Sequence, residues 1–437
     1  MDKKSIEKTL FGTDGIRGKY GEYPLTEINL ILLGNSIALW AKEKYGNNPK
    51  ALIGFDTRVS SIHACLYISL GLKLDGVKTY NSHMMPTPAI AHLVQHDKRF
   101  DFGIIITASH NPYQDNGIKI VDKTGKISKA DEKKITRFFD NESEILDVSE
   151  EAQETYINTI TGYFDKDFLK NTKVILDCAH GATYTVAPRI FEQLGAQVIT
   201  IANKPDGKNI NENCGSTHPQ TLQKAVLEHK ADIGFAFDGD GDRIVAVSKD
   251  GQIKDGDDIL CLLSEHPLYK SQKNIVGTIM SNYGLEIHLN SKNKILIRTD
   301  VGDKHVSKKM REKNLLLGGE QSGHIVLGDY LNLGDGIFTA LRILEAIQAT
   351  GNNNFETFKK CPQTNINIPV ERKKDLSVSP FSDIITEHKN MLQEGRVIVR
   401  YSGTQNLLRV TVEAEDKTVA KDMCVNISNK LEKELSS

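Results

Sequence analysis

The chain has 437 residues, of which 39% are hydrophobic and 26% are charged, an ordinary composition for a globular protein. Its 55 Lys and Arg against 57 Asp and Glu give a formal net charge of −2, so no overall basic field favours binding to nucleic acid or to an anionic membrane. At roughly 150 residues per domain, this length predicts about three domains.

The N-terminus and the cysteines indicate the compartment. Residues 1–15 begin with charged side chains and lack an apolar stretch, and no window approaches the roughly 18 apolar residues of a membrane-spanning helix. The six cysteines are scattered without a C-x-x-C pair, which argues against both a disulfide framework and a structural zinc site. We therefore expect a cytoplasmic protein in a reducing compartment.

Short apolar runs alternate with segments of helical period along most of the chain. This alternation predicts α/β layers with helices on both faces of buried sheets. Helices are expected at residues 182–195 and 336–350, the latter with an apolar stripe that includes Ile337, Leu341 and Leu344. Buried strands are expected at residues 50–58, 102–107, 173–178, 232–238, 274–280 and 295–300.

Polar and turn-rich stretches at residues 140–154, 248–258 and 369–380 divide the chain into four units. In the last unit two strand-like runs around a polar turn precede a long helical segment. The expected fold is therefore three mixed α/β domains with helices on both sheet faces, plus a smaller C-terminal α+β domain. The expected domains are residues 1–153, 154–252, 253–368 and 369–437.

The segment TASHNPYQDNGIKI, residues 107–120, follows one of the predicted buried strands. That strand ends in Ser109, His110 and Asn111 in front of Pro112. Small polar side chains at a strand end usually only form a turn and bond to local backbone groups. On these residues alone a turn is the simpler interpretation, and Lys119 is equally compatible with a solvated strand end.

The strongest chemical signal is DGDGDR, residues 238–243, directly after another predicted strand. Asp238, Asp240 and Asp242 alternate with glycines that let the backbone fold tightly. Two like charges about 4 Å apart cost about 4 kcal/mol at an effective dielectric of about 20, so the cluster needs a cation or a proton. Oxygen ligands indicate a hard cation, and Mg²⁺ fits best. An EF-hand loop is excluded because its sixth and twelfth positions would be Arg243 and Lys249 instead of Gly and Glu.

Three further stretches offer ligands for anions or hydroxyl groups. A metal with three carboxylate ligands keeps open positions, and Arg243 beside it suits a phosphate. In RYSGTQNLLR, residues 400–409, the groups that could cradle a phosphate are Arg400, Ser402, Gly403, Thr404 and Arg409, although a hairpin turn explains the stretch about as well. In GGEQSGHI the side chains that could bond a polyhydroxylated ligand are Glu320, Gln321, Ser322 and His324. FGTDGIRG places Arg17 among glycines, either as a turn residue or as a ligand for an anion.

These stretches stand in the order of the motifs of the α-D-phosphohexomutase superfamily, which the chain resembles over its whole length. FGTDGIRG opens the chain, TASHNP resembles the phosphoserine loop, DGDGDR the metal loop, GGEQSGH the sugar-binding loop and R-x-S-G-T the phosphate-binding loop. Gln321 between Glu320 and Ser322, together with TDVGDKHV at residues 299–306, resembles the phosphoglucosamine mutase branch. The resemblance implies four domains arranged around a central cleft.

The resemblance also implies a role for each singled-out residue. Ser109 matches the serine that carries the phosphoryl group, and Ser109, Asp238, Asp240 and Asp242 would hold Mg²⁺. The implied catalytic set is Ser109, Lys119, Arg17 and His110, with Lys119 as a candidate proton shuttle. The implied substrate-binding set is Arg243, Glu320, Gln321, Ser322, His324, Arg400, Ser402, Gly403, Thr404 and Arg409.

The implied reaction is the reversible conversion of glucosamine 6-phosphate to glucosamine 1-phosphate, with glucosamine 1,6-bisphosphate as intermediate and activator. This reaction would feed the synthesis of UDP-N-acetylglucosamine and cell-wall precursors. The expected partner is a hexosamine phosphate substrate, with no nucleic acid and no membrane, and the protein is expected to be a monomer or homodimer. Two alternatives stay open: a phosphomannomutase or phosphoglucomutase, and a non-catalytic homologue that binds a sugar phosphate without turnover.

One loop departs from the family pattern. The last loop of the family commonly reads R-P-S-G-T-E-P, whereas Tyr401, Gln405 and Asn406 here replace the two prolines and the glutamate. Because proline fixes φ near −65°, its loss predicts a more mobile phosphate-binding loop.

Overall fold

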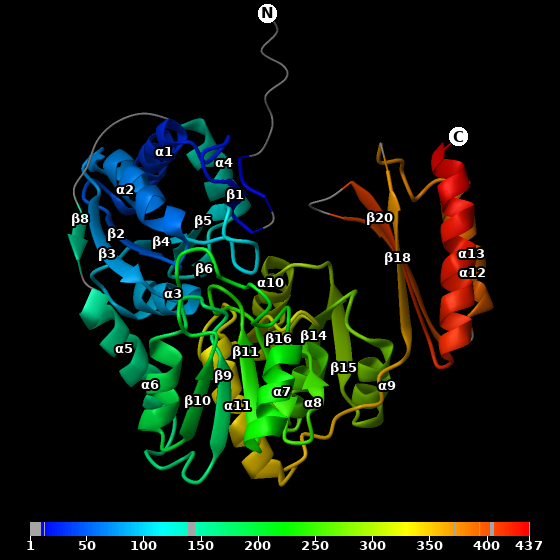
Figure 1. The fold of residues 1–437 in the computed structure, drawn as a ribbon. Coiled ribbons are helices and arrows are strands. Elements are labelled where there is room, and N and C mark those ends of the chain that lie inside the picture. Colours follow the sequence, from blue (N-terminus) through cyan, green and yellow to red (C-terminus); the bar gives the residue numbers. More distant parts are fainter. Residues whose placement is uncertain are drawn as a thin grey trace, which may run out of the picture.

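The computed structural model describes residues 10–12, 14–138, 145–147, 149–370, 372–392, 394–402 and 406–436. In this part of the chain the strands form four sheets, of seven, five, four and three strands, with helices packed against them (Figure 1). The predicted fold class, three α/β units and a smaller C-terminal α+β unit, is confirmed. None of the helices in these ranges combines the length and the hydrophobicity that a membrane span requires.

The first unit contains the seven-stranded sheet. Its strands are β1 (Ile16–Lys19), β2 (Lys50–Phe55), β3 (Lys78–Met84), β4 (Phe102–Ile106), β5 (Asp115–Asp122), β6 (Gly125–Lys126) and β8 (Ile145–Asp147). Its helices are α1 (Glu27–Tyr45), α2 (Val59–Lys73), α3 (Thr87–His96) and α4 (Lys129–Arg137). The strand order is β1-β5-β4-β2-β3-β8, with β6 paired to β5. β2 runs parallel to β3 and β4, whereas β5 runs antiparallel to β4 and β1.

The second unit contains the five-stranded sheet. Its strands are β9 (Lys173–Asp177), β10 (Gln197–Ile201), β11 (Ile233–Phe237), β12 (Ile244–Ser248) and β13 (Ile253–Lys254), in the order β10-β9-β11-β12-β13. Its helices are α5 (Ser149–Thr161), α6 (Val186–Gln193) and α7 (Gln220–His229). Leu176 and Phe235 belong to one buried cluster, whereas Ile175 and Ala236 belong to another. Alternate side chains point to opposite faces of a strand, so this sheet is covered on both faces as predicted.

The third unit contains the four-stranded sheet. Its strands are β14 (Asn274–Thr278), β15 (Ile295–Thr299), β16 (Leu317–Gly319) and β17 (Ile325–Leu327), in the order β15-β14-β16-β17. Its helices are α8 (Gly256–Ser264), α9 (Tyr283–Ser291), α10 (Asp303–Lys313) and α11 (Gly336–Thr350). The helix predicted at residues 336–350 is confirmed, and it begins where the side chain of Asp335 accepts a hydrogen bond from the Phe338 N–H.

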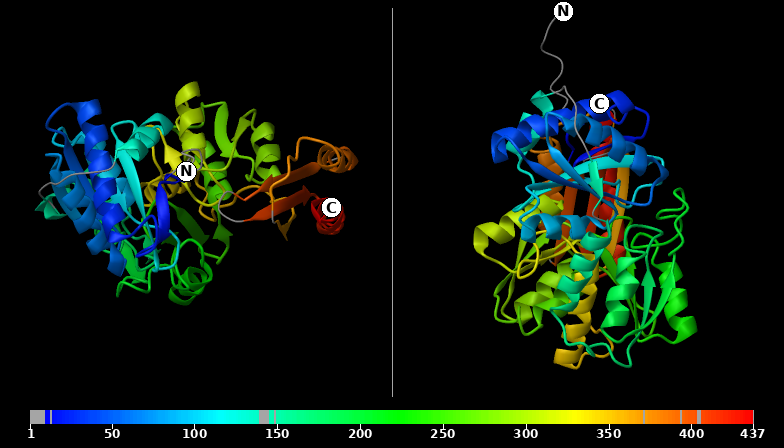
Figure 2. Two further views of the ribbon diagram at one scale, coloured as in Figure 1. Left: turned by 90° about the horizontal axis from the view of Figure 1, so that it is seen from above. Right: turned by 90° about the vertical axis from the view of Figure 1, so that its left-hand side faces the viewer.

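The C-terminal unit is an antiparallel sheet covered by two helices. It consists of β18 (Gln363–Pro369), β19 (Gly395–Tyr401), β20 (Leu407–Ala414), α12 (Phe381–Met391) and α13 (Lys417–Ser436), with strand order β18-β20-β19. Figures 1 and 2 show that this unit stands to the side of the other three. The sequence predicted β19, β20 and α13 but missed β18, whose polar residues give it no hydrophobic run.

Two elements cross the predicted domain boundaries. β18 begins at Gln363, before the expected boundary after residue 368, and all of it pairs with β20. α5 runs from Ser149 to Thr161 and crosses the expected boundary after residue 153. The division into four domains stays a proposal, and the pairing of β18 favours a last boundary ahead of Gln363.

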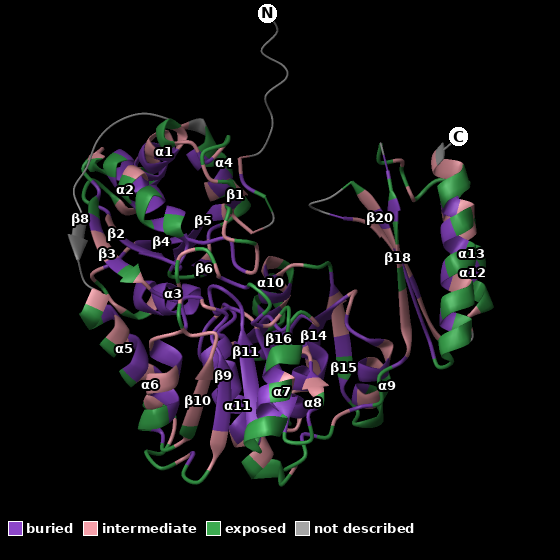
Figure 3. Cartoon of the chain, viewed as in Figure 1, coloured by how far each residue is buried: buried purple, intermediate pink, exposed green. Residues whose placement is uncertain are grey.

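The buried strands place three of the singled-out loops next to one another. β4, β11 and β16 are buried along their whole length (Figure 3), and each is followed by one of these loops. Ser109 follows β4, Asp238 follows β11 and Glu320 follows β16. In α/β folds the carboxyl ends of strands are the usual position of a ligand site, so these three loops are the candidate site.

Candidate active site

Ser109 is held at the strand exit in an unusual backbone conformation. Its φ is 56°, in the left-handed region that costs an L-residue with a Cβ on the order of 1–2 kcal/mol. Its N–H donates to Thr107 Oγ1 at 2.9 Å, and its hydroxyl donates to Asp238 Oδ2 at 2.6 Å. The turn therefore points the Ser109 oxygen at the acidic loop of the second unit. The surface turn considered from the sequence does not describe this residue, which is 1% exposed.

The three aspartates of DGDGDR form a buried cluster. Asp238, Asp240 and Asp242 each present an oxygen such that these atoms lie within 4.8 Å of one another. Burial, followed by the charges of Asp240 and Asp242, raises the pKa of Asp238 to about 8. Crowded carboxylates of this kind need a positive charge among them.

The cluster has the donor atoms for a hard cation. Asp240 Oδ1 and Asp242 Oδ1 are buried and have no hydrogen-bond partner among the described residues. An unsatisfied buried carboxylate oxygen is costly, and oxygen atoms are the ligands that Mg²⁺ prefers. The other Asp240 oxygen accepts a hydrogen bond of 2.6 Å from Thr87 Oγ1, which orients the carboxylate. The residues present therefore fit a divalent metal ion.

Lys119 lies inside the same cluster, not at a solvated strand end. Its Nζ is 2.6 Å from Asp240 Oδ2, 3.2 Å from Asp242 Oδ2 and 3.4 Å from Asp14 Oδ2. Burial opposes the charged form, but the three carboxylates outweigh it and raise the pKa of Lys119 well above its usual value. In this arrangement Lys119 is a cation, so it can stabilise negative charge or donate a proton.

A second group of charges ties the N-terminal motif to this cluster. Arg17 Nη1 donates to the Ala108 carbonyl at 3.0 Å, and Arg17 Nη2 pairs with Asp14. Lys126 Nζ is 2.5 Å from both Asp14 Oδ1 and Asp303 Oδ2. Asp303 begins α10 of the third unit, so Lys126 bridges the first and third units beside the aspartates.

His110 and Arg243 flank the Ser109 hydroxyl and the carboxylates. His110 Nδ1 is 3.2 Å from Ser109 Oγ, and burial, with Arg243 and Arg17 nearby, lowers the pKa of His110 to about 4. The ring is therefore neutral at physiological pH. Arg243 Nε is buried, 3.9 Å from Asp242 Oδ1, without a hydrogen-bond partner in the described ranges. It is a donor available to an anion.

The GGEQSGH loop brings His324 to the aspartates. The Gly334 N–H donates to His324 Nε2 at 3.1 Å, which places the proton of the neutral ring on Nδ1, 3.6 Å from Asp242 Oδ1. Burial opposes charging of the ring, whereas Asp242 and then Asp303 raise its pKa overall. Gly323 has a φ of 91°, and a Cβ there would lie 2.0 Å from the Ile244 carbonyl oxygen, so only glycine allows the loop to pack this closely.

The remaining residues of that loop differ in their surroundings. Glu320 is 7% exposed and accepts a hydrogen bond of 2.7 Å from the Gly302 N–H. Burial lowers the pKa of Arg243, but the charges of Asp242, Asp238 and then Glu320 outweigh it and raise this pKa overall. Gln321 contributes its carbonyl to the Gly256 N–H at 3.0 Å, and Ser322 is exposed. The structure brings Glu320 and His324 to the cluster but leaves Ser322 at the surface.

The candidate phosphate loop lies on the C-terminal sheet. Arg400 and Arg409 face each other in the β19–β20 register, and burial followed by the Arg409 charge lowers the pKa of Arg400. Two arginines at opposed positions repel one another, so a bound anion would stabilise the pair. Ser402 is buried at the end of β19, whereas Gly403, Thr404 and Gln405 lie outside the described residues.

Tyr401 compensates for the missing proline before Ser402. Its hydroxyl accepts a hydrogen bond of 2.8 Å from the Lys374 N–H and donates one of 2.9 Å to the Lys374 carbonyl. Lys373 Nζ lies 5.8 Å from the Tyr401 ring and donates to the Ser402 carbonyl at 3.1 Å. The predicted loss of rigidity is therefore offset on this side of the loop by side-chain contacts.

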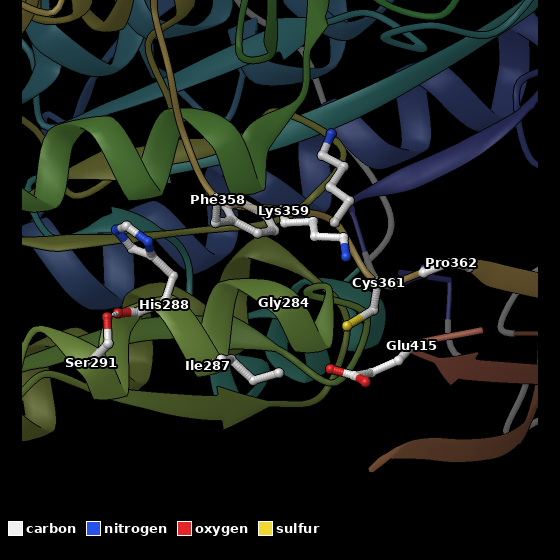
Figure 4. A pocket seen from close by; sticks show the side chains of 10 residues that line it. Gly284, Ile287, His288, Ser291, Phe358, Lys359, Cys361, Pro362 and Glu415 are labelled. Carbon is white, nitrogen blue, oxygen red and sulfur yellow. Dashed lines mark hydrogen bonds between the residues drawn. The ribbon is translucent and has the colours of Figure 1, made fainter. Parts of the chain in front are cut away.

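Several residues that the fold brings to the site were not predicted from the sequence. Asp14 and Asp303 stand inside the motifs FGTDGIRG and TDVGDKHV that were singled out, so their position in those motifs was the available signal. Thr87 and Lys126 carried no signal, because nothing local distinguishes them from ordinary polar residues. A pocket beside α9, lined by Gly284, His288 and residues 358–362 among others (Figure 4), contains none of the predicted site residues.

Comparisons with known proteins agree with this geometry. The sequence matches the phosphoglucomutase/phosphomannomutase alpha/beta/alpha domains I, II and III over residues 8–146, 154–251 and 255–364, and the C-terminal domain over residues 366–430. A Burkholderia thailandensis protein of the phosphoglucomutase/phosphomannomutase family has a TM-score of 0.81 at 23% identity, over 97% of both chains. An Aspergillus fumigatus N-acetylphosphoglucosamine mutase has a TM-score of 0.68 at 16% identity, over 97% of this chain and 96% of that one. These two structures share the fold.

Sequence relatives narrow the family. A phosphoglucosamine mutase of Chlamydia caviae is 40% identical over 99% of this chain and 98% of its own length. One of Pseudomonas putida is 40% identical over 94% of this chain and 96% of its own length. With full-length relatives at this identity and all four domain matches in order, the chain belongs to the phosphoglucosamine mutase family of the α-D-phosphohexomutases.

Proposed function

We propose that this chain interconverts glucosamine 6-phosphate and glucosamine 1-phosphate, with Ser109 as the residue that carries the phosphoryl group. The relatives named phosphoglucosamine mutase support the isomerase activity. The observation that carries the assignment of Ser109 is its 2.6 Å hydrogen bond to Asp238 within the buried aspartate cluster. A nucleophile beside a cation site is the arrangement that phosphoryl transfer requires.

The reaction consists of two phosphoryl transfers. In the first, a hydroxyl oxygen of the sugar phosphate forms a bond to the phosphorus on Ser109, the Ser109 Oγ–P bond breaks, and the hydroxyl proton passes by way of a base to Ser109 Oγ. The product of this step is glucosamine 1,6-bisphosphate, which must reverse its orientation in the site before the second transfer. In the second, Ser109 Oγ forms a bond to the other phosphorus, the bond between that phosphorus and its sugar oxygen breaks, and the Ser109 proton passes to that oxygen. Asp238 and neutral His110 both contact Ser109 Oγ, so they are the groups placed to move a proton there.

Charge stabilisation comes from the groups around the transferred phosphoryl. Asp238, Asp240 and Asp242, with a phosphate oxygen on Ser109, would hold Mg²⁺, which neutralises negative charge on phosphoryl oxygens when it is bound. The Aspergillus fumigatus N-acetylphosphoglucosamine mutase was solved with GlcNAc-6P and magnesium. Lys119, Arg17 and Arg243 add positive charge on the other sides. Because Lys119 is held as a cation, we assign it charge stabilisation and proton donation ahead of the role of a base.

The sugar and its distal phosphate are assigned to the two remaining loops. We assign Glu320 and His324 to the binding of sugar hydroxyls, with Gln321 and Ser322 as further candidates in the same loop. Arg400, Ser402 and Arg409, with Gly403 and Thr404, would bind the distal phosphate.

The remaining expectations concern the protein's surroundings. All six cysteines are free and buried, which fits the reducing cytoplasm. A hexosamine phosphate is the proposed substrate, and monomer and homodimer are both compatible with the chain.

Intact-protein mass spectrometry tests the role of Ser109. Incubation with glucosamine 1,6-bisphosphate and Mg²⁺ should add one phosphoryl group, about 80 Da, to the parent but not to Ser109→Ala. Ser248→Ala is the matched control, because Ser248 is also buried, at the last position of β12, but lies outside the cluster. A Ser109→Ala variant with full mutase activity would refute the assignment.

A coupled assay tests the substrate. The hexose 6-phosphates of glucosamine, mannose and glucose are compared at equal concentration, and glucosamine 6-phosphate should give the highest kcat/KM. A clear preference for mannose or glucose phosphate would indicate a phosphomannomutase or phosphoglucomutase. No turnover of any sugar phosphate, combined with a Ser109 that cannot be phosphorylated, would indicate a binding protein.

A further inference from the structure

Two side chains from different units donate to the same two carbonyl groups of the Ser109 loop. Arg58 Nη2 donates to the Ser109 and Asn111 carbonyls, both at 2.9 Å. Asn211 Nδ2 donates to the same two carbonyls, at 2.8 Å and 3.3 Å. A carbonyl oxygen has two lone pairs, so each carbonyl can accept both donors at once.

Arg58 belongs to the first unit and is bonded on every side. It is 1% exposed, and its Nη1 donates to the Pro112 carbonyl at 2.5 Å and the Asp115 carbonyl at 2.9 Å. Its Nε pairs with Asp56 Oδ2 at 2.8 Å. Arg58 therefore uses its planar fork to fix four carbonyls of the loop that carries Ser109, a geometry that a lysine ammonium cannot reproduce.

Asn211 reaches the same loop from the second unit. It lies in the connection between β10 and α7, has a φ of 59°, and its N–H donates to the Ala179 carbonyl at 2.9 Å. The neighbouring metal loop closes the remaining side, because a Cβ on Gly239 would lie 2.4 Å from the Ser109 carbonyl oxygen and 2.9 Å from Asn211 Nδ2. The Ser109 carbonyl is thus enclosed by both units.

We propose that Arg58 and Asn211 are positioning residues that hold Ser109 in its left-handed conformation and in register with the aspartate cluster; this rests on the proposed role of Ser109. The isolated turn would relax away from a φ of 56°, and relaxation would move Oγ relative to Asp238. Thr107 and Asp56 fix the N–H side of the same turn, since Thr107 Oγ1 accepts from the Ser109 N–H and donates to Asp56 Oδ2 at 2.6 Å. Arg58 and Asn211 fix its carbonyl side.

The test uses two conservative variants of the full chain. Arg58→Lys keeps the charge that Asp56 needs but loses the fork, and Asn211→Asp keeps the shape and tolerance of positive φ but replaces the donor with an acceptor. We expect kcat to fall roughly 10²-fold in each, because a displacement of about 1 Å at the reacting atoms costs about that much. KM for glucosamine 6-phosphate should change little, since neither side chain belongs to the proposed sugar or distal-phosphate sites.

Hydrolysis of the phosphoserine would not change if Arg58 and Asn211 only stabilised the fold, so it tests their positioning role. When the phosphorylated variants are mixed with glucosamine 6-phosphate, a larger fraction of the phosphoryl groups should go to water than in the parent. Because the two residues share both carbonyls, the double variant should lose less than the product of the two single losses. The matched controls are Arg342→Lys and Asn293→Asp. Arg342 is also a buried arginine, paired with Asp329 and Glu345, and Asn293 is also an asparagine of positive φ, at 58°.

The outcomes separate this inference from the proposed function. Parent-like kcat and parent-like partitioning to water in both variants would overturn the inference. A loss of activity that only follows a loss of folded protein, seen as a lower melting temperature with unchanged partitioning, would overturn it as well. An active Ser109→Ala variant would instead remove the proposed function on which the inference rests.

Discussion

The ammonium of Lys119 lies 2.6 Å from Asp240 Oδ2, although 121 residues separate the two in the sequence. Lys119 lies within β5 of the first unit, and Asp240 lies in the metal loop of the second. The contact places a permanent positive charge beside the carboxylates that would hold Mg²⁺. The cluster therefore shares its negative charge between a fixed cation and an exchangeable one, and the first two predictions separate these contributions.

Asp240→Asn tests the metal site. The change removes one anionic oxygen, and kcat should fall roughly 10²–10³-fold, the range for loss of a key electrostatic group. A higher Mg²⁺ concentration should be needed for half-maximal activity, while the far-UV circular dichroism stays that of the parent. Asp250→Asn, in an exposed turn outside the cluster, is the control. Unchanged activity and unchanged Mg²⁺ dependence would show that these aspartates do not hold the metal.

Lys119→Met tests the fixed cation. Activity should fall roughly 10²–10⁴-fold if Lys119 donates a proton or stabilises the phosphoryl charge. Mg²⁺ affinity, measured by calorimetry, should not weaken, because Lys119 no longer competes with Mg²⁺ for the three carboxylates. Lys294→Met is the control, since Lys294 is also buried but donates to the Lys270 and Gln272 carbonyls away from the site. A loss of Mg²⁺ affinity in Lys119→Met would contradict the separate roles.

Tyr401→Phe tests the anchoring of the phosphate-binding loop. The change removes both hydrogen bonds that Tyr401 makes to Lys374, so the loop is less ordered before substrate binds. Part of the binding free energy is then spent on ordering the loop. KM for glucosamine 6-phosphate should rise several-fold, on the order of the loss of one or two net hydrogen bonds, with kcat nearly constant. The control is Tyr45→Phe, because Tyr45 Oη has no hydrogen-bond partner in the described part of the chain.

Tyr401→Pro distinguishes side-chain anchoring from backbone restriction. Proline would restrict φ at this position but would lose the two Lys374 bonds, so we expect it to raise KM as Tyr401→Phe does. A lower KM in Tyr401→Pro would show that the family proline is the better solution here and that the Tyr401 contacts contribute little.

The buried carboxyl of Asp335 should make the free energy of unfolding depend on pH. Burial raises its pKa to about 6 from an ordinary 3.8, although it accepts hydrogen bonds from Phe338 N–H, Tyr156 and Tyr330. The native protein therefore binds more protons than the unfolded chain between these values, and the free energy of unfolding falls as pH rises from about 4 to about 6. A shift of about two pKa units corresponds to roughly 3 kcal/mol.

Asp335→Asn should remove this pH dependence. The melting temperature of the variant relative to the parent should rise between pH 4 and pH 6 and level off above, as measured by calorimetry across that range. Asp165→Asn, at an exposed position, is the control. A parent and an Asp335→Asn variant with parallel profiles would show that Asp335 does not titrate in this window.

The sequence by itself determined the elements and the chemistry that depend on neighbouring residues. The strands at residues 102–107 and 232–238 were predictable because runs of apolar residues specify a buried strand wherever it packs. α11 was predictable from its apolar period. The alternation of Asp and Gly in residues 238–243 predicted a tight acidic cluster, because its carboxylates are brought together by the local backbone alone.

The tertiary structure decided everything that depends on contact between distant segments. Nothing near Asn211 or Lys126 in the sequence distinguishes them from surface polar residues, and β18 has no hydrophobic run. Each obtains its place from packing: Lys126 bridges Asp14 and Asp303, and Asn211 reaches the Ser109 carbonyl across 102 residues. Hydrogen bonds and ion pairs act only over a few ångströms, so their partners exist only after the sheets have packed and brought these segments together.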